Sequence, residues 1–124
     1  MGGQQNTVLY IEDNAANRQL VEMILARRPN VTLLMAETGG SGLKLANEQL
    51  PGLILLDLSL PDMDGVDVLT RLKEDSWTAT IPVFALSGDP HLQYRDGAPA
   101  FDGFLAKPID IQKLFSVIDQ YLNS

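Results

Sequence analysis

The sequence predicts an α/β domain built on a five-stranded parallel β-sheet. Two patterns support this fold class. Five short apolar segments alternate with longer amphipathic segments, which is the order of strands and helices in a parallel sheet. In addition, residues 53–56 are apolar at every position, as is typical of a parallel strand covered on both faces. Right-handed crossovers between the strands would place helices on both faces of the sheet.

The first strand is predicted at residues 7–11, and Asn14 is a suitable N-cap for the helix that follows. Pro29 and Asn30 are expected to end this helix. Its apolar positions are predicted to include Ala16, Leu20, Met23, Ile24 and the aliphatic stem of Arg27.

The second strand is predicted at residues 31–36 and the second helix at residues 38–48. Gly39, Gly40 and Gly42 fall in the first turns of this helix. Each interior glycine costs about 1 kcal/mol relative to alanine. The helix is therefore expected to begin late or to be mobile.

The third strand, residues 53–56, is followed by a helix for which Asp64 is a suitable cap. The apolar face of this helix is expected to contain Val66, Leu69 and Leu72. Strands are predicted at residues 81–86 and 103–106, and Asp110 can cap the last helix. The apolar side of that helix is expected to contain Ile111, Leu114, Phe115, Ile118 and Leu122.

A short additional helix is predicted between the fourth and fifth strands. Asp89 is a good N-cap, Pro90 suits the first helical position and Gly97 favours a C-terminal stop. These signals leave room for about two turns.

Length and composition predict one compact domain at residues 7–124, preceded by a flexible tail at residues 1–6. The absence of cysteine excludes disulfides and thiolate metal sites. The net charge of −7 argues against direct binding to nucleic acid, which needs a basic surface. No apolar run is long enough to span a membrane, and no signal peptide is recognisable, so a cytoplasmic location is expected.

Polar residues follow four of the predicted strands. Glu12 and Asp13 follow the first strand, Asp57 the third, Ser87 the fourth and Lys107 the fifth. Ligands of open parallel sheets bind at the carboxyl ends of the strands, so these side chains are expected to converge at one edge.

Such a cluster suits phosphoryl transfer. Three neighbouring carboxylates need a counter-ion, and Mg²⁺ with oxygen ligands satisfies that need best. Lys107 adds a positive charge, and Ser87 adds a hydrogen-bond donor. A phosphoryl group passing to a carboxylate needs this kind of charge neutralisation, and an aspartyl phosphate is an established covalent intermediate.

Four segments resemble the response-regulator receiver domains, in the family's order and near its spacing. They are residues 10–14 (YIEDN), 54–65 (ILLDLSLPDMDG), 85–88 (ALSG) and 102–108 (DGFLAKP), and the resemblance extends over about residues 7–122. It implies a doubly wound, flavodoxin-like sheet with strand order 2-1-3-4-5 and helices on both faces.

The resemblance also implies a role for each residue of the acidic cluster. Asp57 looks like the phosphoacceptor and Asp13 like a direct Mg²⁺ ligand, with Glu12 acting through a water molecule. The backbone carbonyl of Ser59 is expected to complete the metal site, and Lys107 to pair with a phosphoryl oxygen.

Two further residues resemble the family's switch. Ser87 is expected to move toward the phosphoryl group, and Phe104 to rotate inward when it does. Pro108 is expected to follow a cis peptide bond.

The expected function is a two-component signalling switch rather than an enzyme acting on a diffusible substrate. A histidine kinase or a histidine phosphotransfer domain would donate the phosphoryl group, and the domain would catalyse its own phosphorylation and dephosphorylation. Because the helix after Asp89 is short, part of the surface through which transcription-factor receivers dimerise would be missing, so a monomer is expected. The domain could act alone or within a hybrid kinase or larger regulator.

Two other functions are open. An aspartate-nucleophile phosphohydrolase would need a second aspartate two residues after Asp57, where this chain has Ser59. A degenerate receiver would act only as an interaction module, although all the chemical residues are present.

Overall fold

The computed structural model of the protein describes residues 4–88 and 100–122, and it confirms the parallel sheet. The strand order is β2-β1-β3-β4-β5, with every pair parallel. The strands are β1 (Gln4–Ile11), β2 (Thr32–Ala36), β3 (Pro51–Asp57), β4 (Val83–Ser87) and β5 (Gly103–Ala106). The helices are α1 (Ala15–Leu25), α2 (Gly39–Gln49), α3 (Gly65–Glu74) and α4 (Ile111–Tyr121).

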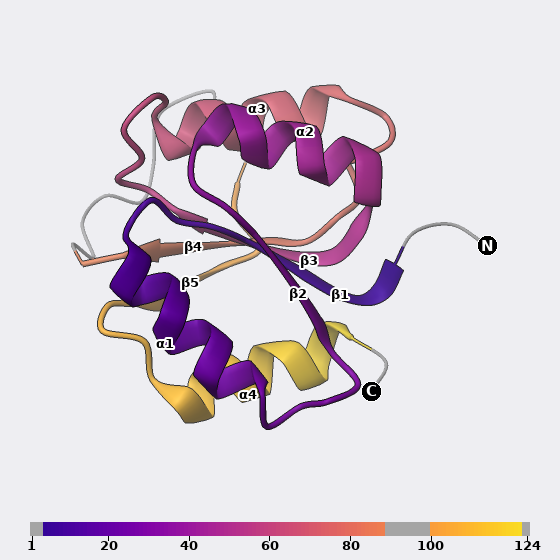
Figure 1. The fold of residues 1–124 in the computed structure, drawn as a ribbon. Coiled ribbons are helices and arrows are strands. Elements are labelled where there is room, and N and C mark those ends of the chain that lie inside the picture. Colours follow the sequence, from indigo (N-terminus) through magenta and orange to yellow (C-terminus); the bar gives the residue numbers. More distant parts are fainter. Residues whose placement is uncertain (1–3, 89–99, 123–124) are drawn as a thin grey trace.

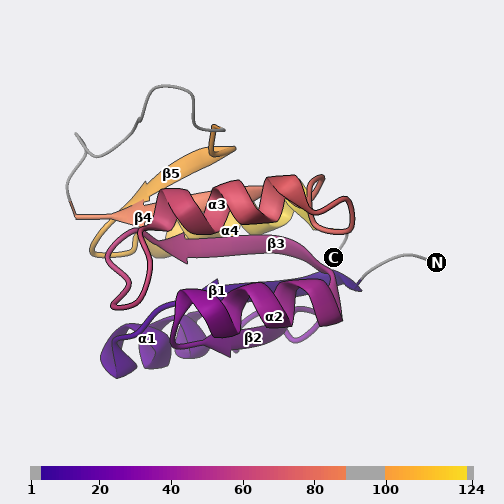
Figure 2. The same ribbon diagram turned by 90° about the horizontal axis from the view of Figure 1, so that it is seen from above.

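Figure 1 shows α2 and α3 on one face of the sheet and α1 and α4 on the other, and Figure 2 shows the same layers from above. The central strand β3 lies between β1 and β4, and Leu53, Ile54, Leu55 and Leu56 are all completely buried. Alternate residues of β3 enter different cores: Leu53 and Leu55 pack toward α1 and α4, while Ile54 and Leu56 pack toward α2 and α3. The uniformly apolar segment is therefore a strand covered on both faces, as predicted.

Three of the helices begin at the predicted caps. Asn14 accepts the Asn17 N–H, Asp64 accepts the Val66 N–H, and Asp110 accepts the Lys113 N–H. These bonds satisfy backbone donors that have no partner within the helix.

The predicted apolar face of α1 is wrong in part. Its buried residues are Val21, Ile24 and Leu25, whereas Leu20 is 38% exposed and Met23 is 71% exposed. Positions 21, 24 and 25 have the i, i+3, i+4 spacing of a single helix face. The predicted set omitted Val21, and only Ile24 of its apolar residues is buried.

The expectation that the second helix begins late is also wrong. Helix α2 begins at Gly39, directly after Thr38, whose side chain accepts the Ser41 N–H in a reciprocal capping box. A Cβ atom at Gly42 would lie 2.4 Å from Ile11 Cδ1, so the glycine allows α2 to pack closely on β1. Capping and close packing therefore outweigh the low helix propensity of glycine.

Strand β1 begins at Gln4, and Gln4 pairs with Pro51 of β3 across a register irregularity. Residues 4–6 therefore belong to the strand, although the sequence assigned them to a tail. The helix predicted between Asp89 and Gly97 lies outside the described residues. Within residues 4–88 and 100–122, no helix is both long and apolar enough to cross a membrane.

Candidate functional site

Three carboxylates converge at the carboxyl edge of the sheet. Glu12 directly follows β1, and Asp57 is the last residue of the neighbouring strand β3. Each of Glu12, Asp13 and Asp57 offers a carboxylate oxygen within 4.8 Å of the other two. Glu12 and Asp57 are buried, with 1% and 2% of their surface exposed, whereas Asp13 is exposed. The topology thus brings together the three acids that the sequence singled out.

Lys107 bridges the two buried acids. Its Nζ lies 2.9 Å from Asp57 Oδ1 and 3.2 Å from Glu12 Oε1. The backbone holds the lysine in place, because the Lys107 N–H donates to the Ser87 carbonyl at 3.0 Å and continues the pairing of β5 with β4. The Lys107–Pro108 peptide bond is cis, as the resemblance implied.

Glu12 is anchored by several donors besides Lys107. The Tyr10 hydroxyl donates to Oε1 at 3.0 Å, and Asn17 Nδ2 donates to the same oxygen at 3.2 Å. The Asn14 N–H donates to Oε2 at 3.2 Å, and Arg18 donates to the Glu12 carbonyl at 2.8 Å. The side chain and the backbone of Glu12 are therefore both held by neighbouring residues.

The close approach of Glu12 and Asp57 shifts their pKa values in opposite directions. Burial and hydrogen bonding with Glu12 raise the pKa of Asp57. Burial alone would raise the pKa of Glu12, but hydrogen bonding with Asp57 and the Asn14 N–H, together with the charge of Lys107, lowers it to about 2. Two carboxylates this close resist double ionisation, and a divalent cation would relieve that conflict.

Lys107 remains charged for a related reason. Burial would lower the pKa of Lys107, but its contacts with Asp57 and Glu12 raise it. The lysine thus balances part of the negative charge of the two buried acids.

The other predicted residues lie just after β3, at the end of β4 and on β5. Ser59 is exposed, and its N–H donates to Asp57 Oδ1 at 3.1 Å. Ser87 is half-buried at the end of β4. Phe104 pairs with Ala85 across β4 and β5, is 37% exposed, and meets the Phe101 ring edge-on with 5.5 Å between the ring centroids.

Sequence reasoning missed three residues that support the site. Tyr10 and Asn17 contact Glu12, and the position of each in the sequence could have indicated this. Tyr10 lies two positions before Glu12, so its side chain projects to the same face of the strand. Asn17 lies in the first turn of α1, which begins shortly after Glu12. The Asp62 carboxylate accepts the Gly39 N–H at 2.8 Å and the Gly40 N–H at 3.0 Å. This contact joins segments far apart in sequence, and no local pattern indicates it.

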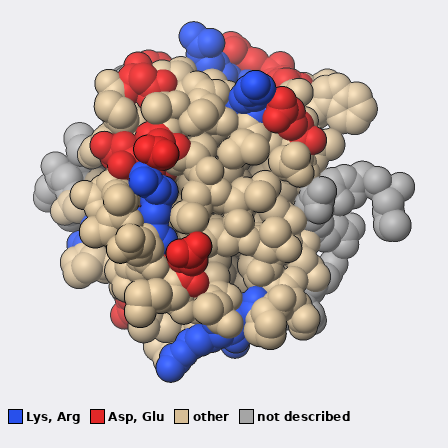
Figure 3. Space-filling model, viewed as in Figure 1, with Lys and Arg blue, Asp and Glu red and all other residues tan. Residues whose placement is uncertain are grey.

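Charged groups are dispersed on the face of the molecule that Figure 3 shows. On the face shown in Figure 3, basic side chains lie in small separate groups among acidic and uncharged residues. That face offers no continuous basic surface of the kind that a nucleic-acid backbone requires.

The chain is a doubly wound α/β domain with a lysine and three acids at the carboxyl edge of its parallel sheet. An acidic cluster of this kind suits a bound cation. The family model described as the response regulator receiver domain matches residues 8–119. The chain therefore belongs to the family of response-regulator receiver domains of two-component systems.

Relatives of very different length share this similarity. Histidine kinase P4 of Formosa agariphila is 33% identical over 112 residues, which are 89% of this chain and 8% of that protein. The polar-differentiation response regulator DivK of Brucella ovis is 32% identical over 121 residues, which are 94% of this chain and 95% of that protein. The chain thus spans a small part of one relative and nearly the whole of the other.

Among solved structures, the chain resembles the receiver domain of sensor histidine kinase PA1611 from Pseudomonas aeruginosa. The TM-score is 0.82 at 23% sequence identity, covering 98% of this chain and 100% of that domain. The PA1611 structure contains a magnesium ion coordinated in its active site cleft. At this identity the comparison supports the fold.

Proposed function

We propose that this receiver domain is a phosphorylation-dependent switch in which Asp57 accepts a phosphoryl group from a phosphohistidine. The observation that carries the proposal is the placement of Asp57, which is 2% exposed and 2.9 Å from the Lys107 ammonium at the centre of the carboxyl edge. The donor would be a histidine kinase or a histidine phosphotransfer domain.

The donor set at this edge suits Mg²⁺, which prefers oxygen ligands and retains several water molecules. Asp13, Asp57 and the Ser59 carbonyl would hold the ion, and Glu12 would act through a water molecule. When bound, the ion would neutralise charge on the carboxylates and on the phosphoryl oxygens. The exposure of Asp13 beside two buried acids supports this assignment, because it leaves the cluster open to solvent on one side.

In the transfer step, a carboxylate oxygen of Asp57 forms a bond to phosphorus as the bond from phosphorus to the histidine nitrogen breaks. The nitrogen leaves with the electron pair. Lys107 neutralises charge on a phosphoryl oxygen, which requires little movement because its Nζ already contacts Asp57. Water later attacks the phosphorus, the bond from phosphorus to the Asp57 oxygen breaks, and inorganic phosphate leaves as the carboxylate is restored.

The output would be a change at β4 and β5. Ser87 would move toward the phosphoryl group, and Phe104 would rotate inward. Phe104 starts from a partly exposed position on β5 and pairs with Ala85 of β4.

The lengths of the relatives are compatible with two contexts, a module of a larger histidine kinase or a stand-alone regulator. In either context the domain would act as a signalling protein rather than as an enzyme that turns over a diffusible substrate. Two-component relatives of both kinds support a histidine kinase as the partner.

Phosphate incorporation from phosphoramidate in the presence of Mg²⁺ tests the proposal. The wild type should incorporate label, and Asp57→Asn should incorporate none. Glu48→Gln, which removes an exposed carboxylate on α2, should serve as the matched control with unchanged incorporation. Persistent labelling of Asp57→Asn would show that another residue is the acceptor. A wild type that binds Mg²⁺ but takes no label, and whose amide spectrum does not respond to beryllofluoride, would instead support a degenerate interaction module.

A further inference from the structure

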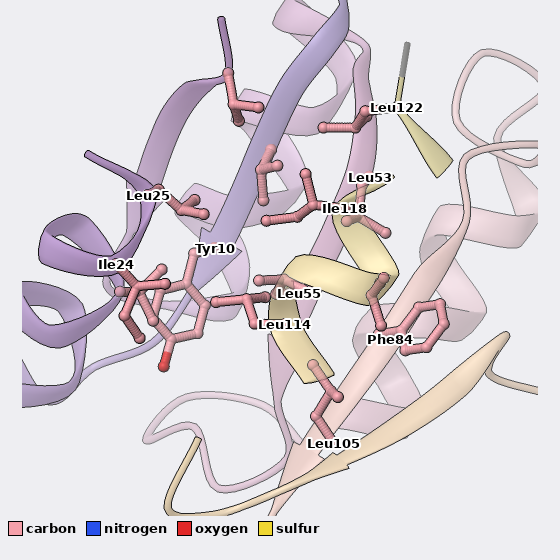
Figure 4. Close-up of a cluster of buried hydrophobic side chains, with 14 of the residues drawn as sticks. Tyr10, Ile24, Leu25, Leu53, Leu55, Phe84, Leu105, Leu114, Ile118 and Leu122 are labelled. Atoms are coloured by element: carbon pink, nitrogen blue, oxygen red, sulfur yellow. The ribbon is translucent and has the colours of Figure 1, made fainter. Parts of the chain in front are cut away.

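Tyr10 carries a polar group within an otherwise apolar core. The residue is completely buried in the cluster between the sheet and helices α1 and α4. In Figure 4 its ring lies among apolar side chains, and its hydroxyl oxygen is directed away from them. The hydroxyl donates to Glu12 Oε1 at 3.0 Å, so the buried polar group is satisfied by a residue of the candidate site.

Glu12 Oε1 is fully occupied by donors. It receives the Tyr10 hydroxyl at 3.0 Å, Asn17 Nδ2 at 3.2 Å and Lys107 Nζ at 3.2 Å. The other oxygen, Oε2, receives the Asn14 N–H at 3.2 Å. Rotation of the carboxylate would break several of these bonds at once. Two of the bonds come from Tyr10 and Asn17, whose side chains play no part in the proposed chemistry.

We propose that Tyr10, supported by Asn17, is a positioning residue that fixes the Glu12 carboxylate for magnesium binding at Asp13 and Asp57. This inference rests on the proposed metal site. Glutamate has one more rotatable bond than aspartate, so its carboxylate loses more conformational freedom when it is held in one place. The hydroxyl of Tyr10 holds it before the ion arrives.

The physical effect is that of an outer-shell partner. Groups that orient the ligands of a metal typically change metal affinity by about 10- to 100-fold when they are removed. Tyr10 acts one step further out, through a residue expected to reach the ion by a water molecule. Its loss should therefore weaken Mg²⁺ binding by about three- to tenfold, below that range.

The test is an NMR titration of amide shifts with MgCl₂, supported by denaturation midpoints measured without metal. Tyr10→Phe keeps the ring and removes only the hydroxyl, so it should weaken binding about three- to tenfold. Asn17→Ala, at the surface end of the same network, should weaken binding in the same direction and serves if Tyr10→Phe does not fold. Tyr121→Phe is the matched control, because Tyr121 lies in α4 and packs edge-on against Phe84; its affinity should equal that of the wild type.

A double-mutant cycle separates positioning from general packing. In a Glu12→Ala background, Tyr10→Phe should cause no further loss of affinity, because the residue through which it acts is gone. Equal affinity of the wild type, Tyr10→Phe and Asn17→Ala would overturn the proposal, and so would an equal loss in both backgrounds. Failure of the metal site itself gives a different result: the wild type would not bind Mg²⁺, or Asp13→Asn would bind it equally well.

Discussion

Two regions of the site differ in burial and hydrogen bonding. At the ends of β1 and β3, Glu12 and Asp57 are buried, and several hydrogen bonds hold Glu12, whereas on β5 Phe104 is 37% exposed. At the ends of β1 and β3, the Glu12 carboxylate is held by Lys107, Tyr10 and Asn17. At the ends of β4 and β5, Ser87 is half-buried, and the Phe104 ring meets the Phe101 ring edge-on. The region proposed to perform chemistry is held by hydrogen bonds, and the region proposed to transmit the signal is more exposed to solvent. Each of the following predictions tests one side of this contrast.

Lys107→Ala should have the largest effect, because it removes the only cation that contacts both buried acids among the described residues. Loss of one charge-stabilising donor typically costs about 100-fold or more in rate. We therefore expect phosphorylation from phosphoramidate to slow by about 100-fold, while Mg²⁺ still binds. Stopped-flow kinetics and a metal titration measure the two quantities separately, and a rate within a few-fold of wild type would contradict the role of Lys107.

Asp13→Asn should weaken Mg²⁺ binding by about tenfold or more, because it removes the charge of the proposed direct ligand. The denaturation midpoint without metal should change little, since Asp13 is exposed. Glu48→Gln removes an exposed carboxylate on α2 and is the matched control. If Asp13→Asn and Glu48→Gln bind Mg²⁺ equally well, the ion binds elsewhere.

Phe104→Ala should separate the two regions of the site. Phosphorylation and Mg²⁺ affinity should stay close to wild type, because the ring contacts neither Asp57 nor Lys107 among the contacts described. The amide shifts that beryllofluoride induces along β4 and β5 should shrink, because the ring proposed to change position is gone. Full wild-type shifts in this variant would show that the signal leaves the site by another route.

Asp62 should give the smallest effect, and its contribution should depend on pH. The N–H groups of Gly39 and Gly40 lower the pKa of Asp62 in the folded protein. A lowered folded-state pKa means that the stabilising contribution is present above the unfolded-state pKa and is lost as pH falls through the folded-state pKa. Wild type should therefore be slightly more stable than Asp62→Asn at neutral pH, and the difference should vanish in acid.

Amide shifts of Gly39 and Gly40, followed by NMR during an acid titration, check this prediction directly. In the wild type they should report the titration of Asp62 below the ordinary aspartate range. A titration at the ordinary aspartate pKa would mean that the contact does not persist in solution.

The residues most accessible to sequence reasoning were those placed by topology. Because parallel strands end at one edge, the order of the strands alone indicated that Glu12, Asp57 and Lys107 would meet. Leu20 and Met23 show where such reasoning fails, because a helix can be identified without its rotation on the sheet being known. Gly42 shows the same limit in energetic terms: its low propensity was visible in the sequence, but the Ile11 side chain that requires it was not.

The link between Asp62 and α2 has a consequence for how this chain can vary. The segment after β3 is fixed at both of its ends, at Asp57 by the sheet and at Asp62 by the first N–H groups of α2. Between them lie only residues 58–61, including Pro61, so this short connection has little spare length or conformational freedom. Deleting or inserting a residue here would break the link or displace Ser59, whereas replacing a side chain need do neither. Natural or engineered variants of this sequence should therefore carry substitutions in residues 58–61 but no insertions or deletions there.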